Sequence, residues 1–505
     1  MEIHGLREEE LLIRRLEGYQ ASDQYPFHMP GHKRLKQGGE GLGFPDPFSI
    51  DITEIQGFDN LHHPEGILKR SMEWAAGLYG ADETRYLVNG SSSGILSAIC
   101  GCVKRGGKLL MSRNCHKSVY HGAYLHQLKT VYVYPQTVPG LGIQGGIPAQ
   151  DVEKELSREG NEDIQAVLIV SPTYDGVVSD IKRIAEAVHQ AGIPLIVDEA
   201  HGAHFRYGAE FPQSALELGA DVVIQSVHKT MPSLTQTALL HMKANRPGGG
   251  FYMDPGAVRR YLSIYQSSSP SYVLMAGIEN SIFRMEQMRE KTREYMQELE
   301  EMRGRLASMK CLCLADRGLV GSSGIFDLDR TKIVVSTRGT SLTGETLMEL
   351  LRSRYHLEME MCGADYVTAI STVMDSKEGL LRLERALLEI DEECRKWGIE
   401  EPGKAVLKEP SCVYSRKNQV KLTLAEALDG LGRRIGLKEA VGDISGEFVY
   451  IYPPGIPILA PGEVISRETV ELILDYKAKG LSVQGPEDES LGAIKVVENE
   501  KKRKE

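Results

Sequence analysis

One lysine stands out because of the residues on either side of it. The stretch "QSVHKTMPSLTQTALLHM", residues 225 to 242, places Lys229 after an apolar, β-like run and before a segment rich in Ser and Thr. Ser226 and His228 flank it closely. An amine set among hydroxyls and an imidazole can bond to an electrophilic carbon or pair with an anion. The pattern therefore indicates a site for an electrophilic or anionic ligand at Lys229.

Two further polar groups follow apolar runs that read as strands. "VNGSSSG" puts Ser91, Ser92 and Ser93 between a strand and a helix, where free backbone N–H groups and hydroxyls can hold a phosphate. "LIVDEAHG" ends a buried run with Asp198, and a buried carboxylate needs a cationic partner. Each group also has an ordinary interpretation: a Ser-rich helix N-cap for the serines, and an N-cap or a solvated loop residue for the aspartate.

A histidine completes the set. "RNCHKSVYHG" offers His116 at the start of a helix, where an imidazole could stack on a flat ring, although a lone histidine there is commonly a surface or core residue. Together these groups are the parts that hold pyridoxal 5'-phosphate (PLP). Lys229 would form a Schiff base with the cofactor aldehyde, and Asp198 would pair with the protonated pyridine nitrogen. The phosphate would be held by Ser91, Ser92, Ser226 and His228.

The elements that must position these residues follow from periodicity. Residues 65 to about 240 alternate between helical and strand-like patterns. "EGILKRSMEWAAGLYG" has Leu68, Met72, Ala75 and Tyr79 on one helical face and stops at Gly80. The runs "TRYLV", "KLLMS", "AVLIV", "IPLIVD" and "ADVVIQ" are apolar and are separated by segments such as "ILSAICGCVKR" and "IKRIAEAVHQAG". This rhythm predicts a parallel sheet covered on both faces, with ligands bound beyond the carboxyl ends of the strands.

Composition narrows the class of protein. A chain of 505 residues with 41% hydrophobic content predicts a multidomain globular protein. No apolar run approaches the ~20 residues that cross a bilayer, and the charged N-terminus is unlike a signal peptide, so we expect a cytoplasmic protein. The net charge of -11 argues against nucleic acid as the main partner but suits a cationic small molecule. The eight cysteines form no CxxC pair, which predicts reduced, mostly buried thiols and no metal site.

Six motifs occur in order along almost the whole chain: "FHMPGHKR", "NGSSSG", "RNCHKS", "DEAHGAHF", "SVHKTMPSLTQTALLH" and "YPPGIPILAPGE". Together they resemble the ornithine/lysine/arginine decarboxylases, PLP enzymes of the aspartate-aminotransferase fold (fold type I). The resemblance implies an α/β protein: a large domain with a mainly parallel seven-stranded sheet, a small α/β domain and a C-terminal α+β domain. The larger members begin with a receiver-like wing domain, for which this chain has no room before "HMPGHK". It resembles the shorter, biosynthetic arginine decarboxylases, and we expect a homodimer or a higher homo-oligomer whose subunit interface completes the active site.

The resemblance also implies roles for single residues. Lys229 corresponds to the Schiff-base lysine and Asp198 to the partner of the pyridine nitrogen. His116 would stack on one face of the cofactor ring, with Ala200 beneath the other face. The chain has "DEAH" where the larger enzymes resemble "D-S-A-W", so His201 takes the place of a tryptophan that approaches the phenolic oxygen of the cofactor. Ser93 joins Ser91 and Ser92 as an expected cofactor-binding residue.

The reaction expected from these parts is decarboxylation. The α-carboxylate must stand perpendicular to the cofactor ring, so that the electrons of its bond enter the π-system as CO2 leaves. His228 or Lys229 then returns a proton to Cα, and the sequence does not choose between them. The same cofactor residues serve aminotransferases, aldolases and desulfurases, which are distinguished by product: CO2 without a 2-oxo acid. A catalytically silent regulatory homologue is an alternative of another class.

The substrate is expected to be a basic amino acid, because the family acts on these. We expect arginine, giving agmatine and CO2 in polyamine biosynthesis, with lysine and ornithine as alternatives. Glu463, fixed by the Pro and Gly turns of "YPPGIPILAPGE", is the candidate partner of the guanidinium, since a carboxylate can accept two parallel hydrogen bonds from it. The other interpretation of Glu463 is a helix-start glutamate for "VISRETVELIL".

Four parts are expected along the chain. They are an N-terminal arm at 1–45, the PLP-binding large domain at 46–300, the small α/β domain at 301–400 and the C-terminal domain at 401–505. Residues 280–309 have the pattern of one long charged helix that leaves the large domain. A linker near "WGIEEPGKAVLKEP" precedes the C-terminal domain, and the tail "KKRKE" is expected to be a frayed terminus.

Overall fold

The computed structural model describes residues 2–3, 6–7, 11–34, 43–396, 417–452 and 455–498. The expected linker at 397–410 and the tail at 501–505 lie outside the described residues. Within the described ranges, no helix is long and apolar enough to cross a membrane. The seven cysteines found there are free, and four of them are buried: Cys100, Cys115, Cys311 and Cys394.

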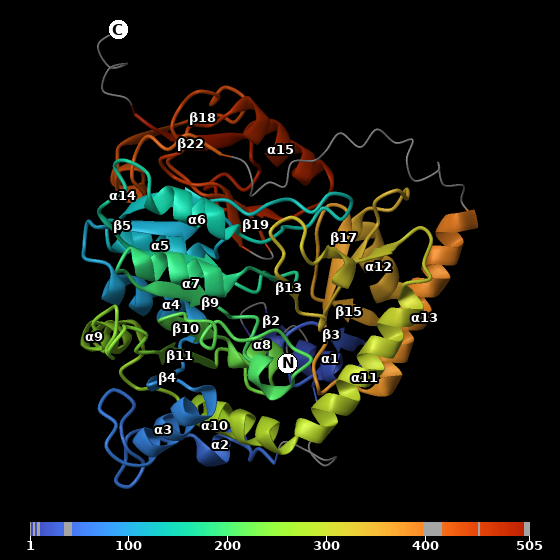
Figure 1. Cartoon of the computed structure of the whole chain (residues 1–505). Helices are drawn as coiled ribbons and strands as arrows, with labels where there is room; N and C mark the ends of the chain where they lie inside the picture. The colour runs from blue at the N-terminus through green and yellow to red at the C-terminus, as the bar shows by residue number, and fades with distance from the viewer. Residues whose placement is uncertain are drawn as a thin grey trace.

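A seven-stranded sheet forms the centre of the large domain (Figure 1). In spatial order its strands are β4 (Glu83–Leu87), β11 (Ala238–Met242), β10 (Val222–Gln225), β9 (Leu195–Asp198), β7 (Ile164–Val170), β5 (Lys108–Ser112) and β6 (Lys129–Val133). The five strands from β10 to β6 run parallel, and β11 is antiparallel to both of its neighbours. The mainly parallel, seven-stranded sheet is therefore confirmed.

Helices cover both faces of this sheet, each face with its own apolar cluster. One face is covered by α4 (Gly90–Cys102), α5 (Lys117–Leu125) and α9 (Pro255–Tyr265). The other is covered by α3 (Ile67–Tyr79), α6 (Ala149–Leu156), α7 (Ile181–Gln190) and α10 (Tyr272–Gln287). The predicted apolar face of α3 is buried, and the helix ends at Gly80 in the left-handed conformation that glycine adopts readily.

Helix α4 begins earlier than the periodicity predicts. The sequence places its start after the "NGSSSG" turn, whereas the helix already begins at Gly90, with Asn89 as N-cap. The three serines therefore lie in the first turn of the helix, not in a loop before it. This position leaves first-turn N–H groups without intrahelical partners, as a site for an anion requires.

A second, four-stranded sheet lies to one side of the first, at the right in Figure 1. Its order is β12 (Cys313–Leu314), β14 (Lys332–Ser336), β17 (Tyr366–Ile370) and β16 (Met361–Cys362), with helices α12 (Gly344–Tyr355) and α13 (Lys377–Lys396). The expected helix at 280–309 is two helices, because α10 ends at Gln287 and α11 (Arg289–Leu306) follows after Met288. Near the N-terminus, β3 (Tyr25–Phe27) pairs in parallel with β15 (Leu357–Met359).

The C-terminal part has its own core and lies at the top in Figure 1. It contains the pair β18 (Gly432–Gly436) and β22 (Ala493–Val497), the sheet β20 (Ile456–Leu459), β19 (Val449–Ile451) and β21 (Val483–Gln484), and the helices α14 (Leu424–Asp429) and α15 (Arg467–Ala478). The other described strands and α-helices are β1 (Glu2–Ile3), β2 (Leu6–Arg7), α1 (Leu12–Ala21), α2 (Pro47–Ile50), the pair β8 (Val177–Val178) and β13 (Asp327–Leu328), and α8 (Val227–Thr230).

Candidate active site

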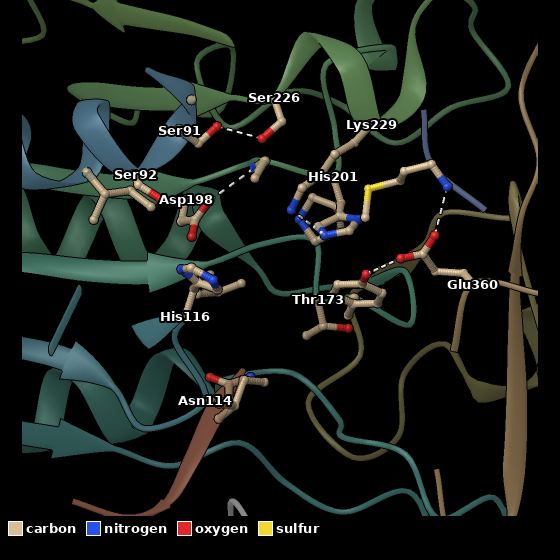
Figure 2. Close-up of a pocket in the computed structure, with 18 of the residues that line it drawn as sticks. Ser91, Ser92, Asn114, His116, Thr173, Asp198, His201, Ser226, Lys229 and Glu360 are labelled. Carbon is tan, nitrogen blue, oxygen red and sulfur yellow. Dashed lines mark hydrogen bonds between the residues drawn. The ribbon is translucent and has the colours of Figure 1, made fainter. Parts of the chain in front are cut away.

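A cavity of about 320 Å³ opens beyond the carboxyl ends of the parallel strands. Nine of the predicted site residues line it: Ser91, Ser92, His116, Asp198, Ala200, His201, Ser226, His228 and Lys229. All of them except Ala200 and His228 are labelled in Figure 2. They come from segments spread over 139 positions of the chain, from 91 to 229. The sheet thus gathers at one place the residues that the sequence indicates separately. Two predicted residues, Ser93 and Glu463, do not line the cavity.

Lys229 lies on the one-turn helix α8, directly after strand β10. Its Nζ is 3.0 Å from His201 Nε2 and 5.8 Å from the centre of the Tyr174 ring. Burial lowers the pKa of the Lys229 amine, and the nearby carboxylates of Asp198 and Glu360 oppose this shift. The surroundings therefore increase the share of neutral amine, which is the nucleophilic form.

Asp198 is the last residue of strand β9 and is buried. Burial raises the pKa of its carboxyl group, because the charged form loses its hydration, and the Lys229 charge opposes this. Among the residues that the structure describes, the one hydrogen bond to this carboxylate comes from the Ala200 N–H, at 3.1 Å. A cation placed against Asp198 would therefore be strongly favoured.

The hydroxyls of Ser91 and Ser226 meet at 2.5 Å between Oγ atoms, and so join the first turn of α4 to the start of α8. Both line the cavity together with Ser92. Ser93 turns away, since its hydroxyl donates to the Gly90 carbonyl oxygen at 2.8 Å. This corrects the expectation for the Ser93 hydroxyl, which does not line the cavity, whereas binding of the phosphate by the Ser93 backbone N–H stays a prediction.

Two of the three histidines that line the cavity, His228 and His116, have partners that define which ring nitrogen carries the proton. His228 Nδ1 lies 2.9 Å from the Thr237 carbonyl oxygen, which can only accept, so Nδ1 carries the proton. Burial lowers the pKa of His228 to about 4. His116 is the N-cap residue of α5, and its Nδ1 accepts from the Ser118 N–H at 3.2 Å and meets Ser118 Oγ at 2.8 Å. Burial, then the nearby Lys229, lower the pKa of His116 to about 3. Both rings are neutral near pH 7.

Glu463 lies elsewhere. Its side chain is 1% exposed, and Arg113 Nη2 is 3.1 Å from its carboxylate. The same carboxylate accepts from Asn418 Nδ2 at 2.8 Å and from the Ala460 N–H at 3.0 Å. All of these hydrogen bonds reach Oε2, and the carboxylate is enclosed with Arg113 outside the cavity, so the expectation that Glu463 meets the substrate is corrected. Nor is it a helix-start residue, since α15 begins at Arg467 with Ser466 as N-cap.

The cavity has two walls of different origin. We call Ser91, His116, Asp198 and Lys229, all beside strand ends of the large sheet, the sheet wall. We call Met29, Glu360, Tyr452 and Ile456 the outer wall. The outer wall comes from the N-terminal "FHMPGHKR" segment, the connection between β15 and β16, and the C-terminal part.

Sequence reasoning assigned no role to any residue of the outer wall, nor to four further lining residues: Asn114, Gln144, Thr173 and Tyr174. Four of them, Met29, Asn114, Tyr452 and Ile456, lie in the motifs "FHMPGHKR", "RNCHKS" and "YPPGIPILAPGE" given above. Those motifs could have identified them as neighbours of the site. Glu360, in "EMEMCG", has no such signal.

Comparison with known proteins agrees with this geometry. Residues 11–338 match the family described as "Orn/Lys/Arg decarboxylase, major domain". The chain belongs to the Orn/Lys/Arg decarboxylase family. The C-terminal domain of the same family matches residues 409–483. Among relatives, the arginine decarboxylase of Bacillus subtilis is 32% identical over 94% of this chain and 95% of its own length.

Solved structures show that the family fold extends over nearly the whole chain. Lysine decarboxylase A from Pseudomonas aeruginosa aligns with a TM-score of 0.74 at 20% identity, covering 96% of this chain and 80% of the other. A serine palmitoyltransferase solved with PLP aligns with a TM-score of 0.50 at 16% identity over 65% of this chain and 77% of its own. The chain therefore has the fold of the Orn/Lys/Arg decarboxylases and, in its larger part, of fold type I enzymes.

Proposed function

We propose that this chain is a PLP-dependent decarboxylase of basic L-amino acids, with L-arginine as substrate and agmatine and CO2 as products. The observation that supports it most is the convergence of the Lys229 amine, the buried Asp198 carboxylate and the Ser91–Ser226 pair in one cavity. Arginine is favoured because three relatives that match nearly full length at 31–32% identity are named arginine decarboxylases. In this proposal the reaction belongs to polyamine biosynthesis and takes place in the cytoplasm.

The residues of the sheet wall fit PLP. The hydroxyls of Ser91 and Ser226 and the first-turn N–H groups of α4 suit its phosphate. Asp198, whose buried carboxylate has one hydrogen bond from the described residues, suits the protonated pyridine nitrogen. His116 and the small Ala200 side chain both line the space that a flat ring would occupy. When bound, PLP supplies the electron sink that stabilises the carbanion left by loss of CO2.

The chain's own residues handle the proton. Lys229 Nζ is 3.0 Å from His201 Nε2, so the lysine can hold a proton and donate it in a hydrogen bond to this imidazole, whose pKa burial keeps well below its usual value. His228 is different, because its Nδ1–H is directed to the Thr237 carbonyl oxygen and the neutral ring has a lone pair, not a proton, on Nε2. This arrangement favours the Lys229 amine over His228 as the group that returns the proton to Cα.

The test is to incubate the purified protein with PLP and, separately, arginine, lysine and ornithine, and to identify the amine and the CO2 released. Agmatine from arginine is the expected product; cadaverine or putrescine instead would move the assignment to lysine or ornithine. Lys229→Ala should abolish both the visible absorption of bound cofactor and CO2 release, whereas the exposed Lys104→Ala should leave both unchanged. A 2-oxo acid product without CO2 would contradict decarboxylation.

The proposal includes a homodimer. Phe58, Ile67, Trp74 and Phe283 are exposed and line one apolar groove of about 690 Å³. Phe48, on the short helix α2, is 93% exposed. Such an exposed apolar surface is typical of a protein–protein contact. Sedimentation of the wild type should give twice the mass of the chain, and Phe58→Ser with Phe283→Ser should shift the equilibrium towards monomer. A monomeric wild type would contradict this part of the proposal.

A further inference from the structure

Glu360 lies where the cavity meets a second hollow. It follows strand β15 and lines the cavity opposite the sheet wall. An adjoining groove of about 640 Å³, bordered by helix α12 and by residues 480–482, shares Glu360 and Tyr452 with the cavity. In Figure 2 Glu360 lies on the far side of Lys229 and His201 from Ser91 and Asp198. A substrate bound at Lys229 therefore has Glu360 ahead of it, away from the cofactor.

The carboxylate of Glu360 is held in place by two neutral donors. Oε2 accepts from the Met29 N–H at 2.8 Å, and Oε1 accepts from the Tyr174 hydroxyl. These donors belong to the N-terminal segment and to the large domain, so Glu360 is fixed from two sides. Two carboxylate oxygens offer about four acceptor positions, and these bonds use two of them. Within the described parts of the chain, no Lys, Arg or His side chain pairs with Glu360 within 4 Å.

No other carboxylate in the cavity suits a distal cation. Asp198, the only other acidic residue among the described lining residues, is at the sheet wall and suits the cofactor nitrogen. Glu463 is enclosed with Arg113 outside the cavity. A basic side chain that enters this cavity would therefore meet one carboxylate that is held in position and, among the described residues, forms no ion pair within 4 Å.

We infer that Glu360 receives the distal cation of the substrate and so determines the preference for a basic side chain. The inference rests on the proposed function, because it names the group that recognises the guanidinium or ammonium of that substrate. Replacing a carboxylate that pairs with a cation by its neutral amide removes the charge but keeps the shape. Such a change weakens substrate binding much more than it affects the bonds that react. Substitution of Glu360 should therefore change KM and the preference for a basic substrate side chain, and should leave cofactor binding unchanged.

The experiment compares PLP-loaded wild type with Glu360→Gln, Glu360→Asp and the control Glu349→Gln, which makes the same chemical change on the groove outside the cavity. Each is assayed with arginine and with citrulline, which has the length of arginine but a neutral end group. Calorimetry with agmatine measures recognition of the cation without turnover. Glu360→Gln should raise KM for arginine at least about 100-fold, weaken agmatine binding by a similar factor and reduce the preference for arginine over citrulline equally. Glu360→Asp should keep the preference, and Glu349→Gln should match the wild type.

The assays with wild type and with the Glu360 variants distinguish a failure of the proposed function from a failure of the inference about Glu360. A wild type that releases no CO2 from any basic amino acid would refute the proposed function, and agmatine binding would still report on Glu360. A wild type that decarboxylates arginine, with a Glu360→Gln variant that keeps its KM and its preference, would overturn the inference alone. Thermal unfolding and the visible absorption of the bound cofactor check that each variant is folded. If Glu360→Gln does not fold, equal arginine and citrulline turnover by the charge-keeping Glu360→Asp would overturn it instead.

Discussion

The sheet wall and the outer wall of the cavity are positioned by different kinds of structure. The sheet wall follows from one continuous sheet, in which Asp198 of β9 stands directly beside Ile224 of β10, five residues before Lys229. Beneath it, buried side chains of four neighbouring strands or strand ends form a hydrogen-bonded chain: Glu199, Gln225, His241 and Thr84. Its geometry is therefore set by strand pairing.

The outer wall depends on a few contacts between distant segments. The Gly31 N–H donates to the His228 carbonyl oxygen at 2.7 Å, and the Thr372 hydroxyl donates to the Gly31 carbonyl oxygen at 2.8 Å. The C-terminal part is held by Arg113, which donates to the carbonyl oxygens of Pro457 and Ile458 and to Glu463. Each segment of the outer wall can therefore be loosened by one substitution, whereas the sheet wall shares the stability of the core.

The largest effect on stability is expected when the Arg113–Glu463 pair, which holds the C-terminal part of the outer wall, is removed. Glu463→Ala leaves the Arg113 guanidinium buried without its carboxylate, which typically costs about 3–5 kcal/mol. We expect unfolding at a clearly lower urea concentration. Glu463→Gln should cost less, because the amide oxygen can still accept from Ala460 or Asn418. Glu471→Ala, an exposed glutamate of the same C-terminal part, is the control. Equal stability of Glu463→Ala and the control would show that the pair does not hold this wall.

Asp198→Asn should lower the catalytic rate that depends on the sheet wall without lowering the stability of the protein. The neutral amide removes the charge expected to keep the cofactor nitrogen protonated, so kcat should fall about 100- to 1000-fold while cofactor remains bound. Burial disfavours the charged form of Asp198, so the thermal midpoint of the apoprotein should hold or rise. Steady-state assays and thermal unfolding measure the two effects, with Asp151→Asn on the surface as control. Turnover within a few-fold of wild type would show that Asp198 has a structural role and does not act on the cofactor.

The same contrast explains what could be predicted from the sequence. Apolar runs that end in polar residues predict a parallel sheet and a common edge, so Asp198, Lys229, His116 and Ser91 were found without knowing any long-range contact. Ser93 was misplaced because a helix start is uncertain by a few residues, and α4 begins at Gly90. The side chain that faces a ligand changes with each residue along that first turn.

The outer wall could not be predicted in this way. Arg113 and Glu463 are 350 positions apart, so nothing local shows that the glutamate is already paired. Glu360 depends on how the four-stranded sheet packs beside the large domain, and its sequence has neither a turn signal nor a regular pattern. Motifs such as "FHMPGHKR" indicated only that something in these segments is needed. Their partners become visible only when distant segments are brought together.

Gly31→Ala tests the contact between the two walls, because Gly31 lies in the N-terminal segment of the outer wall and packs against α8, the helix that carries Lys229. A Cβ at Gly31 would lie 2.7 Å from the Met231 carbonyl oxygen and 2.9 Å from the Met231 nitrogen, which are backbone atoms that cannot move aside freely. Either the N-terminal segment or α8 with Lys229 must shift. Since misplacement by about 1 Å can cost 100-fold in rate, we expect kcat to fall about 10- to 100-fold. Gly18→Ala, where a Cβ meets nothing within 4 Å, is the control. Unchanged kcat and cofactor absorption in Gly31→Ala would show that the contact yields without affecting Lys229.

The smallest expected effect concerns the chain of hydrogen bonds beneath the sheet wall. It can be tested by the pH dependence of the free energy of unfolding. His241 is fully buried, with Nδ1 2.8 Å from Thr84 Oγ1, and burial lowers its pKa to about 3. An unfolded histidine titrates near 6.5, so below that pH the unfolded chain takes up a proton that the folded chain does not. The contribution is complete above pH 6.5 and is lost as the pH falls towards 3, by about 1.4 kcal/mol per pH unit. His116 and His228 contribute in the same way, so His241→Gln should lower the slope of stability against pH between pH 6.5 and 5 by the share of one histidine in urea unfolding, whereas the exposed His63→Gln should leave it unchanged. An unchanged slope in His241→Gln would mean that the ring is not held neutral beneath the sheet wall.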